Sequence, residues 1–446
     1  NKNHNRVFAG INISFGARTH NTDQNALMAT PVYRNLNVNT TSNGIPVSDT
    51  TSYGPEQERY DNVNFVDDEN GSSGGAGTYE DPYASIDQAT SGSGEDTRIY
   101  VADTGTNYTS NDDITLQDGQ GIYGRSDDFY APTTGSDQAT IKFTNSDGFI
   151  ATSSNDFSDI TIVGGGYANP SNSNTAITIN ENSDSNEVSQ INNVNIGSTN
   201  KNTSYQTGIV MDKNSKANIN NSTITGYTDR STDDGTDAYG IYAVQAKSLT
   251  ISNSTINSNA NSKEGESYAI HFNNSASNNY NAKLTITDST INAINSKLWA
   301  TGIYAEGAIF KLSNSTVNAT SSIEPWGILL VRATSSTIDN SNINTTSLEP
   351  STSYGIVGFT NNGDFTLSNS TINTNDGGTA YGLDLEDFSG EINIHDNYIN
   401  TAAGNDAYGI NLENIGSISI KHNIFNIGST YGKTTSLTVD GVAVNT

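Results

Sequence analysis

Short runs of alternating apolar and polar residues recur from about residue 147 onward, at spacings of 26 to 35 residues. The clearest copies read apolar-x-Ile/Leu-x-Asn/Asp-Ser-Thr-Ile/Val and occupy residues 249–256, 284–291, 310–317 and 365–372. A second segment, usually an aromatic residue followed by Gly-Ile or Gly-Leu, recurs with the same period. Alternation with a period of two predicts β-strands, and a repeat of this length predicts one solenoid coil per repeat. We therefore expect an all-β parallel β-helix of about ten or more coils.

The repeats place like residues above one another, because each coil stacks on the previous one. The Asn of the first segment is expected to form a structural ladder, its side-chain amides bonding the next coil and the turn backbone. The ladder positions are Asn193, Asn221, Asn253, Asn314, Asn340 and Asn369. The ladder also accounts for the repeated Asn-Ser-Thr sequons. The Tyr and Trp residues of the second segment are expected to stack at a corner, with a sugar-binding strip as the alternative.

The first residues differ from the repeats. In residues 1–16, apolar side chains alternate with polar ones and the segment ends in Ser-Phe-Gly, a pattern that suits either the last strand of an outer-membrane β-barrel or an ordinary half-buried strand. Residues 17–60 read as a linker, and residues 26–38 within it read ALMATPVYRNLNV. This stretch resembles the end of the barrel domain of inverse autotransporters, the intimin and invasin family. The resemblance covers residues 1 to about 40 and implies an exported passenger after the linker.

Residues 61–146 are interpreted as an N-terminal cap with the first coils, and residues 147–446 as the β-helix repeats. Within the cap, residues 65–89 predict a strand, a Gly-rich turn and one short helix, with Asp81 as its N-cap and Pro82 in its first turn. This segment resembles the cap of right-handed parallel β-helix proteins of the pectate-lyase-like superfamily. The resemblance implies a right-handed solenoid, and that fold serves enzymes and adhesins alike.

Alternation in the aromatic-Gly strand sorts its residues into inward and outward positions. The first and third residues after Gly point inward, so the second and fourth point outward. The outward positions give the candidate ligand-binding residues Tyr242, Tyr304, Leu329, Val357, Phe359, Asp384, Glu386 and Glu413. The apolar members form a patch that is either covered by a loop or used by a partner. The acidic members gather carboxylates on adjacent coils.

The carboxylates are compatible with a glycoside hydrolase, because Glu386 and Glu413 are expected to lie one rung, about 5 Å, apart. A pectate-lyase-type reaction also needs a basic residue over a bound metal, and Arg332 lies two coils away with the wrong parity. We therefore expect no catalytic residue. The oxygen-rich loop 67–71 is a weak Ca²⁺ candidate without the EF-hand spacing, so no cofactor is expected. His395 and His422 are expected to be surface or ladder residues, with a metal pair as the alternative.

The net charge of the chain limits the classes of molecule that it can bind. The chain of 446 residues has 20 Lys and Arg against 48 Asp and Glu, a net charge of −28, and no cysteine. Nucleic acids and anionic membrane surfaces are poor partners for such a surface. We predict the passenger of a Gram-negative surface adhesin, located at the outer membrane, which binds a glycan or protein of a host or neighbouring cell through the side of the rod. A polysaccharide lyase or glycoside hydrolase and a passive stalk are the alternatives.

Overall fold

The structure is a computed structural model that describes residues 62–144, 146–152, 154–164, 174–181, 187–197, 205–228, 237–261, 264–275, 281–295, 297–440 and 442–443. The predicted barrel strand 1–16 and linker 17–60 lie outside the described residues. No helix in these ranges is long and apolar enough to cross a membrane.

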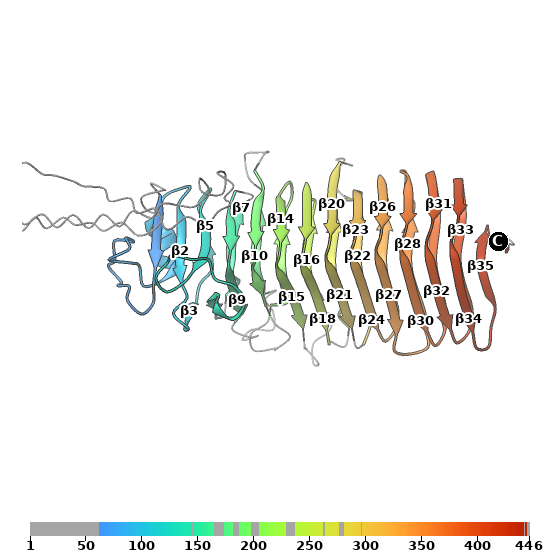
Figure 1. The fold of residues 1–446 in the computed structure, drawn as a ribbon, viewed down its shortest axis with the longest axis horizontal. Helices are drawn as coiled ribbons and strands as arrows, with labels where there is room; N and C mark the ends of the chain where they lie inside the picture. The colour runs from blue at the N-terminus through green and yellow to red at the C-terminus, as the bar shows by residue number, and fades with distance from the viewer. Residues whose placement is uncertain are drawn as a thin grey trace, which may run out of the picture. The chain divides into compact units, whose positions relative to one another are not determined.

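The described chain forms a right-handed parallel β-solenoid, as predicted. Strands of successive coils pair in parallel and lie side by side along one axis (Figure 1). A full coil has three strands, and we name the three sides of the solenoid the first, second and third faces. One sheet of 24 strands contains the first and second faces, and another of 12 strands forms the third. Twelve rungs on the third face agree with the expected ten or more coils.

The first-face strands are β4 (Ile114–Thr115), β7 (Phe149–Thr152), β10 (Thr175–Asn180), β13 (Thr207–Met211), β16 (Ala238–Val244), β19 (Ser267–Asn273), β22 (Ala300–Glu306), β25 (Pro325–Val331), β28 (Thr352–Phe359), the first parts of β31 (Thr379–His395) and β33 (Ala407–Lys421), and β35 (Thr434–Val439). The second-face strands are β1 (Val63–Val66), β2 (Arg98–Ala102), β5 (Gly121–Arg125), β8 (Asp156–Ser158), β11 (Ser189–Asn192), β14 (Lys216–Asn220), β17 (Ser248–Ser252), β20 (Ala282–Thr287), β23 (Ala308–Ser313), β26 (Ser335–Asp339), β29 (Phe365–Ser368), and the later parts of β31 and β33.

The third-face strands are β3 (Asn107–Ser110), β6 (Ala139–Phe143), β9 (Ile160–Gly164), β12 (Asn195–Ile196), β15 (Thr223–Thr228), β18 (Thr255–Ala260), β21 (Thr290–Asn295), β24 (Thr316–Ser321), β27 (Asn342–Ser347), β30 (Thr371–Asp376), β32 (Tyr398–Ala403) and β34 (Ile424–Ser429). β36 (Val442–Ala443) pairs antiparallel with β35, and one short 3-10 helix covers Gly135–Asp137.

The core is a stack of inward apolar side chains. Ile241 pairs with Ile270, and Ile303 with Ile328, in adjacent first-face strands, and all four are fully buried. The Gly of the aromatic-Gly motif makes this packing fit. A Cβ on Gly327 would lie 2.5 Å from the methyl Cγ2 of the core Ile of β27 and from a carbonyl oxygen of the next coil, which is too close for any side chain.

From β8 onward, the corner between the second and third faces contains one left-handed residue in each coil. The predicted Asn ladder positions all occupy it, with φ between 45° at Asn340 and 54° at Asn193. Asn tolerates this conformation better than most residues, because its short side chain forms local hydrogen bonds. Asn340 donates to the side chain of Asn314 over 2.7 Å, whereas Asn253 donates to Asn220, which lies on the second face rather than in the corner.

The residue after each corner Asn builds a second, buried ladder. The Ser254 hydroxyl accepts the backbone N–H of Ser222 in the previous coil over 3.1 Å and donates to the Ser252 carbonyl over 2.6 Å. The same bonds continue along the solenoid through Ser289, Ser315, Ser341 and Ser370. These hydroxyls satisfy buried backbone groups that the turn removes from the sheet ladder.

The cap contains the predicted short helix, but not at the predicted start. α2 (Ile86–Gly92) has Ser85 as its N-cap, and the Ser85 hydroxyl accepts the N–H of Gln88. The predicted N-cap Asp81 lies before the helix, where its carboxylate accepts the Ala76 N–H over 3.1 Å and a hydroxyl hydrogen bond from Ser72. Asp81 therefore closes the Gly-rich turn. Ser85 is the N-cap because its extended backbone leads directly into the helix.

Candidate ligand-binding face

All eight candidate ligand-binding residues lie on the outer side of the first face, which we call the aromatic-acidic face. Strand pairing aligns Tyr242, His271, Tyr304, Leu329, Val357, Asp384 and Asn411 in one column. A parallel column contains Val244, Asn273, Glu306, Val331, Phe359, Glu386 and Glu413. The register that the aromatic-Gly motif implied is therefore present, and the inward and outward assignments hold along the face.

A third column on this face contains the aromatic residues of the motif. Tyr381 stacks between Tyr354 and Tyr408, with ring centroids 5.2 and 4.8 Å apart and planes within 9° of parallel. Where Thr301 interrupts the column, Trp299 packs on Trp326 from two residues earlier, at 6.0 Å. Stacked rings cover each other's faces, so the Tyr column presents edges and hydroxyls outward. The Tyr column therefore has a structural role. Trp299 is 38% exposed and presents aromatic surface to solvent.

An aromatic cluster surrounds His271. Its ring lies 5.1 Å from that of Tyr242, 5.0 Å from Tyr268 and 4.6 Å from Tyr304. Burial lowers the pKa of His271 to about 4, so the imidazole is neutral at physiological pH. Its Nδ1 atom is buried and has no hydrogen-bond partner among the described residues.

Carboxylates border this cluster and accept the tyrosine hydroxyls. Tyr239 donates to Asp237 over 2.7 Å, and Tyr304 donates to Glu306 over 2.5 Å. Glu306 is almost fully buried, and Arg332 forms an ion pair with it. Arg332 therefore serves Glu306 rather than the carboxylates two coils further on, which agrees with the parity argument from the sequence.

The predicted apolar patch is mostly closed. Leu329 is only 6% exposed and Val357 only 2%, although both point outward from their strands. Phe359 remains 37% exposed. Of the two alternatives, a covered patch therefore holds for Leu329 and Val357, whereas Phe359 keeps exposed apolar surface.

The acidic group lies at the C-terminal end of the face. Asp384 accepts a 2.8 Å hydrogen bond from Asn411 in the next coil. Burial raises the pKa of Asp384, and the nearby charges of Glu413 and Glu386 raise it further. Glu386 and Glu413 are direct register partners on adjacent strands, as the sequence predicted. One partly desolvated carboxyl thus lies beside two carboxylates that reach solvent.

The candidate metal ligands are engaged by protein groups. Asp67 accepts the backbone N–H groups of Glu69 and Asn70, both over 2.9 Å, so its carboxylate closes a turn. His395 pairs with Lys421 rather than with His422, which follows in the corner, and both histidines contact Asp396, at 2.9 and 3.6 Å. Across the described ranges, no group of three or more His, Asp or Glu residues is arranged to hold a metal ion.

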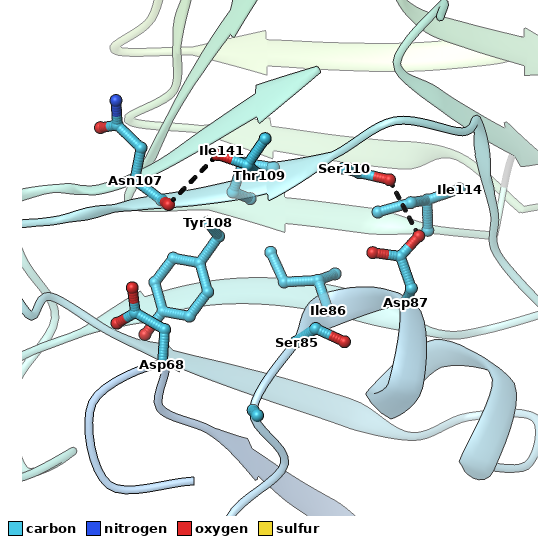
Figure 2. Close-up of a pocket in the computed structure, with 11 residues that line it drawn as sticks. Asp68, Ser85, Ile86, Asp87, Asn107, Tyr108, Thr109, Ser110, Ile114 and Ile141 are labelled. Atoms are coloured by element: carbon cyan, nitrogen blue, oxygen red, sulfur yellow. Dashed lines mark hydrogen bonds between the residues drawn. The ribbon is translucent and has the colours of Figure 1, made fainter. Parts of the chain in front are cut away.

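A small pocket of about 80 Å³ lies in the cap, between α2 and β3. Asp68 and Asp87 lie at opposite sides of its apolar lining, and Ser110 donates to Asp87 over 2.9 Å (Figure 2). The Tyr108 hydroxyl donates to the Ala102 carbonyl, and burial raises the pKa of Tyr108. The Asp68 carboxylate already accepts hydroxyl hydrogen bonds from Thr104 and Thr106. These contacts give the pocket a structural role in the cap.

Sequence reasoning missed a second Asn ladder, on the outer side of the third face. Asn292, Asn318, Asn344 and Asn373 each donate a side-chain N–H to the amide of the previous coil over 2.7–2.8 Å. The signal was present, because an Asn follows the last apolar residue of nearly every Ser-Thr-Ile segment.

Comparison with known proteins assigns the chain to no family. No protein-family model matches the chain, and no curated protein matches it. Among solved structures, the A-module of mannuronan C-5 epimerase AlgE6 from Azotobacter vinelandii aligns at 11% identity and TM-score 0.44, over 79% of this chain and 92% of that one. Lacto-N-biosidase from Eubacterium ramulus aligns at 8% identity and TM-score 0.33, over 83% and 69%.

Tailspike protein 3 of bacteriophage CBA120 aligns at 14% identity and TM-score 0.39, over 87% of this chain and 63% of that one. At such identities and scores these structures assign no activity to this chain.

Proposed function

We propose that this chain is the passenger of a cell-surface adhesin that binds its ligand through the aromatic-acidic face, without catalysis. The observation that carries the proposal is the alignment of all candidate binding residues on one side of a continuous solenoid. A long, regular face suits a ligand that contacts several coils at once. The resemblance of residues 1–40 to inverse autotransporters supports display at the outer membrane through residues 1–16.

The chemistry of the face limits the ligand. Stacking covers most ring faces in the Tyr column, while carboxylates and tyrosine hydroxyls offer hydrogen bonds. The guanidinium of Arg332 is neutralised by Glu306. A polyanion would meet repulsion at Glu386 and Glu413. The ligand is therefore a basic protein surface or an uncharged glycan of a host or neighbouring cell.

Binding to arrays of host and bacterial glycans and proteins tests the proposal, with retention and product release measured on the same spots. We expect retention without cleavage. The double variant Glu386→Gln/Glu413→Gln should weaken retention on a basic ligand and reduce its salt dependence, because long-range attraction is screened beyond about 10 Å at 0.1 M salt. The matched control is Glu349→Gln/Asp112→Asn, which removes two exposed charges elsewhere.

If neither retention nor product release occurs on any array, the adhesin proposal is refuted and the passive stalk remains as the explanation. Retention that the double variant does not alter would move the binding site away from the acidic end.

A second candidate, a polysaccharide-active enzyme, is favoured by one observation. The raised pKa of Asp384 beside two solvent-reaching glutamates provides an unequal pair of carboxyl groups, as general acid–base catalysis requires. Product release on a glycan spot, abolished by Glu386→Gln or Asp384→Asn, would establish this function in place of the adhesin.

A further inference from the structure

The third face contains a regular, uncharged lattice of Thr and Asn. On β18, β21, β24, β27 and β30, the first, third and fifth residues point outward and align in three columns. Every one of these positions is Thr or Asn, except for Ile294. The lattice is about 19 Å long, from four rung steps of about 4.8 Å, and about 13 Å wide along the strands. We call it the Thr/Asn face.

The absence of charge on this face is unusual for a protein with a net charge of −28. In the same coils, the outward second-face positions include Lys283, Lys311 and Asp339, and the first face includes Glu306. The Thr/Asn face therefore fits an uncharged partner, by the same electrostatic complementarity that excludes polyanions elsewhere.

The lattice is also rigid and has unused hydrogen-bonding capacity. Each interior Asn of the central column gives one N–H to the previous coil and accepts one from the next, as Asn318 does with Asn292 and Asn344. A primary amide has a second N–H and a second lone pair, and these remain for an external partner. The hydroxyls of Thr290 and Thr316 have no hydrogen-bond partner within the described chain. Donors, acceptors and methyl groups thus repeat in two dimensions at fixed spacings.

These properties favour one partner over the others. The flat faces of sugars are rich in C–H groups and pack on aromatic rings, yet these five strands present no outward aromatic side chain. A lattice of hydrogen-bonded water molecules does not need an aromatic ring for binding. Ordered water forms hydrogen bonds readily with fixed hydroxyl and amide groups. Charged groups would instead hold water in orientations of their own. We propose that the Thr/Asn face binds ice.

This binding surface is separate from the aromatic-acidic face and does not depend on the function proposed for it. On a surface protein, such a face would attach the cell to ice or limit the growth of ice crystals. The side-chain ladder would then have two roles, since the bonds that stabilise the stack also hold the lattice in register.

Thermal hysteresis of the purified full chain, the gap between the melting and freezing points of a single ice crystal, tests the proposal. We expect a measurable gap and faceted crystals. Thr290→Tyr places a bulky ring on the lattice and leaves the Asn ladder intact, so the gap should fall to that of an inert protein. Thr285→Tyr in the same coil has matched burial on the second face and should keep the wild-type gap. Tyrosine is well tolerated in strands.

Circular dichroism confirms the fold of each variant, and Thr316→Tyr on the next rung replaces Thr290→Tyr if that variant unfolds. A wild-type chain without hysteresis refutes the proposal, as does equal loss in Thr285→Tyr. A pull-down with insoluble neutral polysaccharide is the second arm. Retention on the polysaccharide without any effect on ice would overturn the proposal in favour of a sugar lattice.

Discussion

The buried serine ladder allows a quantitative prediction at Ser315. The residue is 3% exposed, and its hydroxyl accepts the Ser289 N–H over 3.1 Å and donates to the Ser313 carbonyl over 2.7 Å. Ser315→Ala removes both bonds. The Ser313 carbonyl keeps the N–H of Asp288 as a partner, but the Ser289 N–H is left buried and unpaired.

An orphaned buried donor costs about 1–3 kcal/mol, so we expect Ser315→Ala to lower the free energy of unfolding by about 2 kcal/mol. That loss corresponds to a change of roughly 30-fold in the unfolding equilibrium. Urea unfolding followed by far-UV circular dichroism measures it. Ser313→Ala is the control, because that side chain is half-exposed on the second face and its carbonyl is retained.

The chain itself provides a rescue variant. In the last coils the column continues as Asn397 and Asn423, and the Asn397 side-chain oxygen accepts the Ser370 N–H over 2.9 Å. Ser315→Asn supplies an equivalent acceptor and should lose less stability than Ser315→Ala. The reasoning is refuted if Ser315→Ala is no less stable than Ser313→Ala, or if the Asn variant is the least stable of the three.

Three further outcomes are expected, each measured by urea unfolding. Asn314→Ala should lose about 1–2 kcal/mol at its left-handed corner, whereas Asn314→Gly should lose less, and equal losses would contradict the backbone argument. Tyr381→Ala should lower the free energy of unfolding by about 1–3 kcal/mol, because two ring contacts disappear, whereas Tyr381→Phe keeps both contacts. An Ala variant as stable as the wild type would show that the stack does not stabilise the fold. Burial raises the folded-state pKa of Asp384, so the folded chain holds this proton more tightly than the unfolded one, and this carboxyl destabilises the fold as pH rises through and above its ordinary value of about 3.9. Asp384→Asn should therefore be more stable than wild type at about pH 7 and show a smaller difference at about pH 3; a constant difference would remove the electrostatic cause.

Some of the site followed directly from the sequence. Parallel coils align equal positions, so the register of Tyr242, Asp384 and Glu386 on the first face could be predicted from the spacing of the Gly residues. The register does not determine how much of each outward side chain is exposed to solvent. Val357 points outward as predicted and is still buried, because neighbouring side chains on the same face close over it.

Ring geometry was also beyond the sequence. A column of Tyr is compatible with rings that face a sugar or with rings that face one another, and only the positions of Tyr354, Tyr381 and Tyr408 show the second arrangement. The cap helix gives a similar lesson. Asp81 and Ser85 both suit an N-cap by residue type, and the tertiary contact of Asp81 with the Gly-rich turn decides between them.

The sequence by itself determined the solenoid, its period and the inward or outward direction of each strand residue, because a periodic chain has few ways to bury its apolar positions. Tertiary structure alone decided which outward residues reach solvent, which hydroxyls and amides satisfy the corners, and that Arg332 neutralises Glu306. Those properties depend on neighbours one coil away, where small differences in side-chain length and loop path decide the contact. Periodicity fixes which residues are stacked, and packing fixes what each stacked residue can still bind.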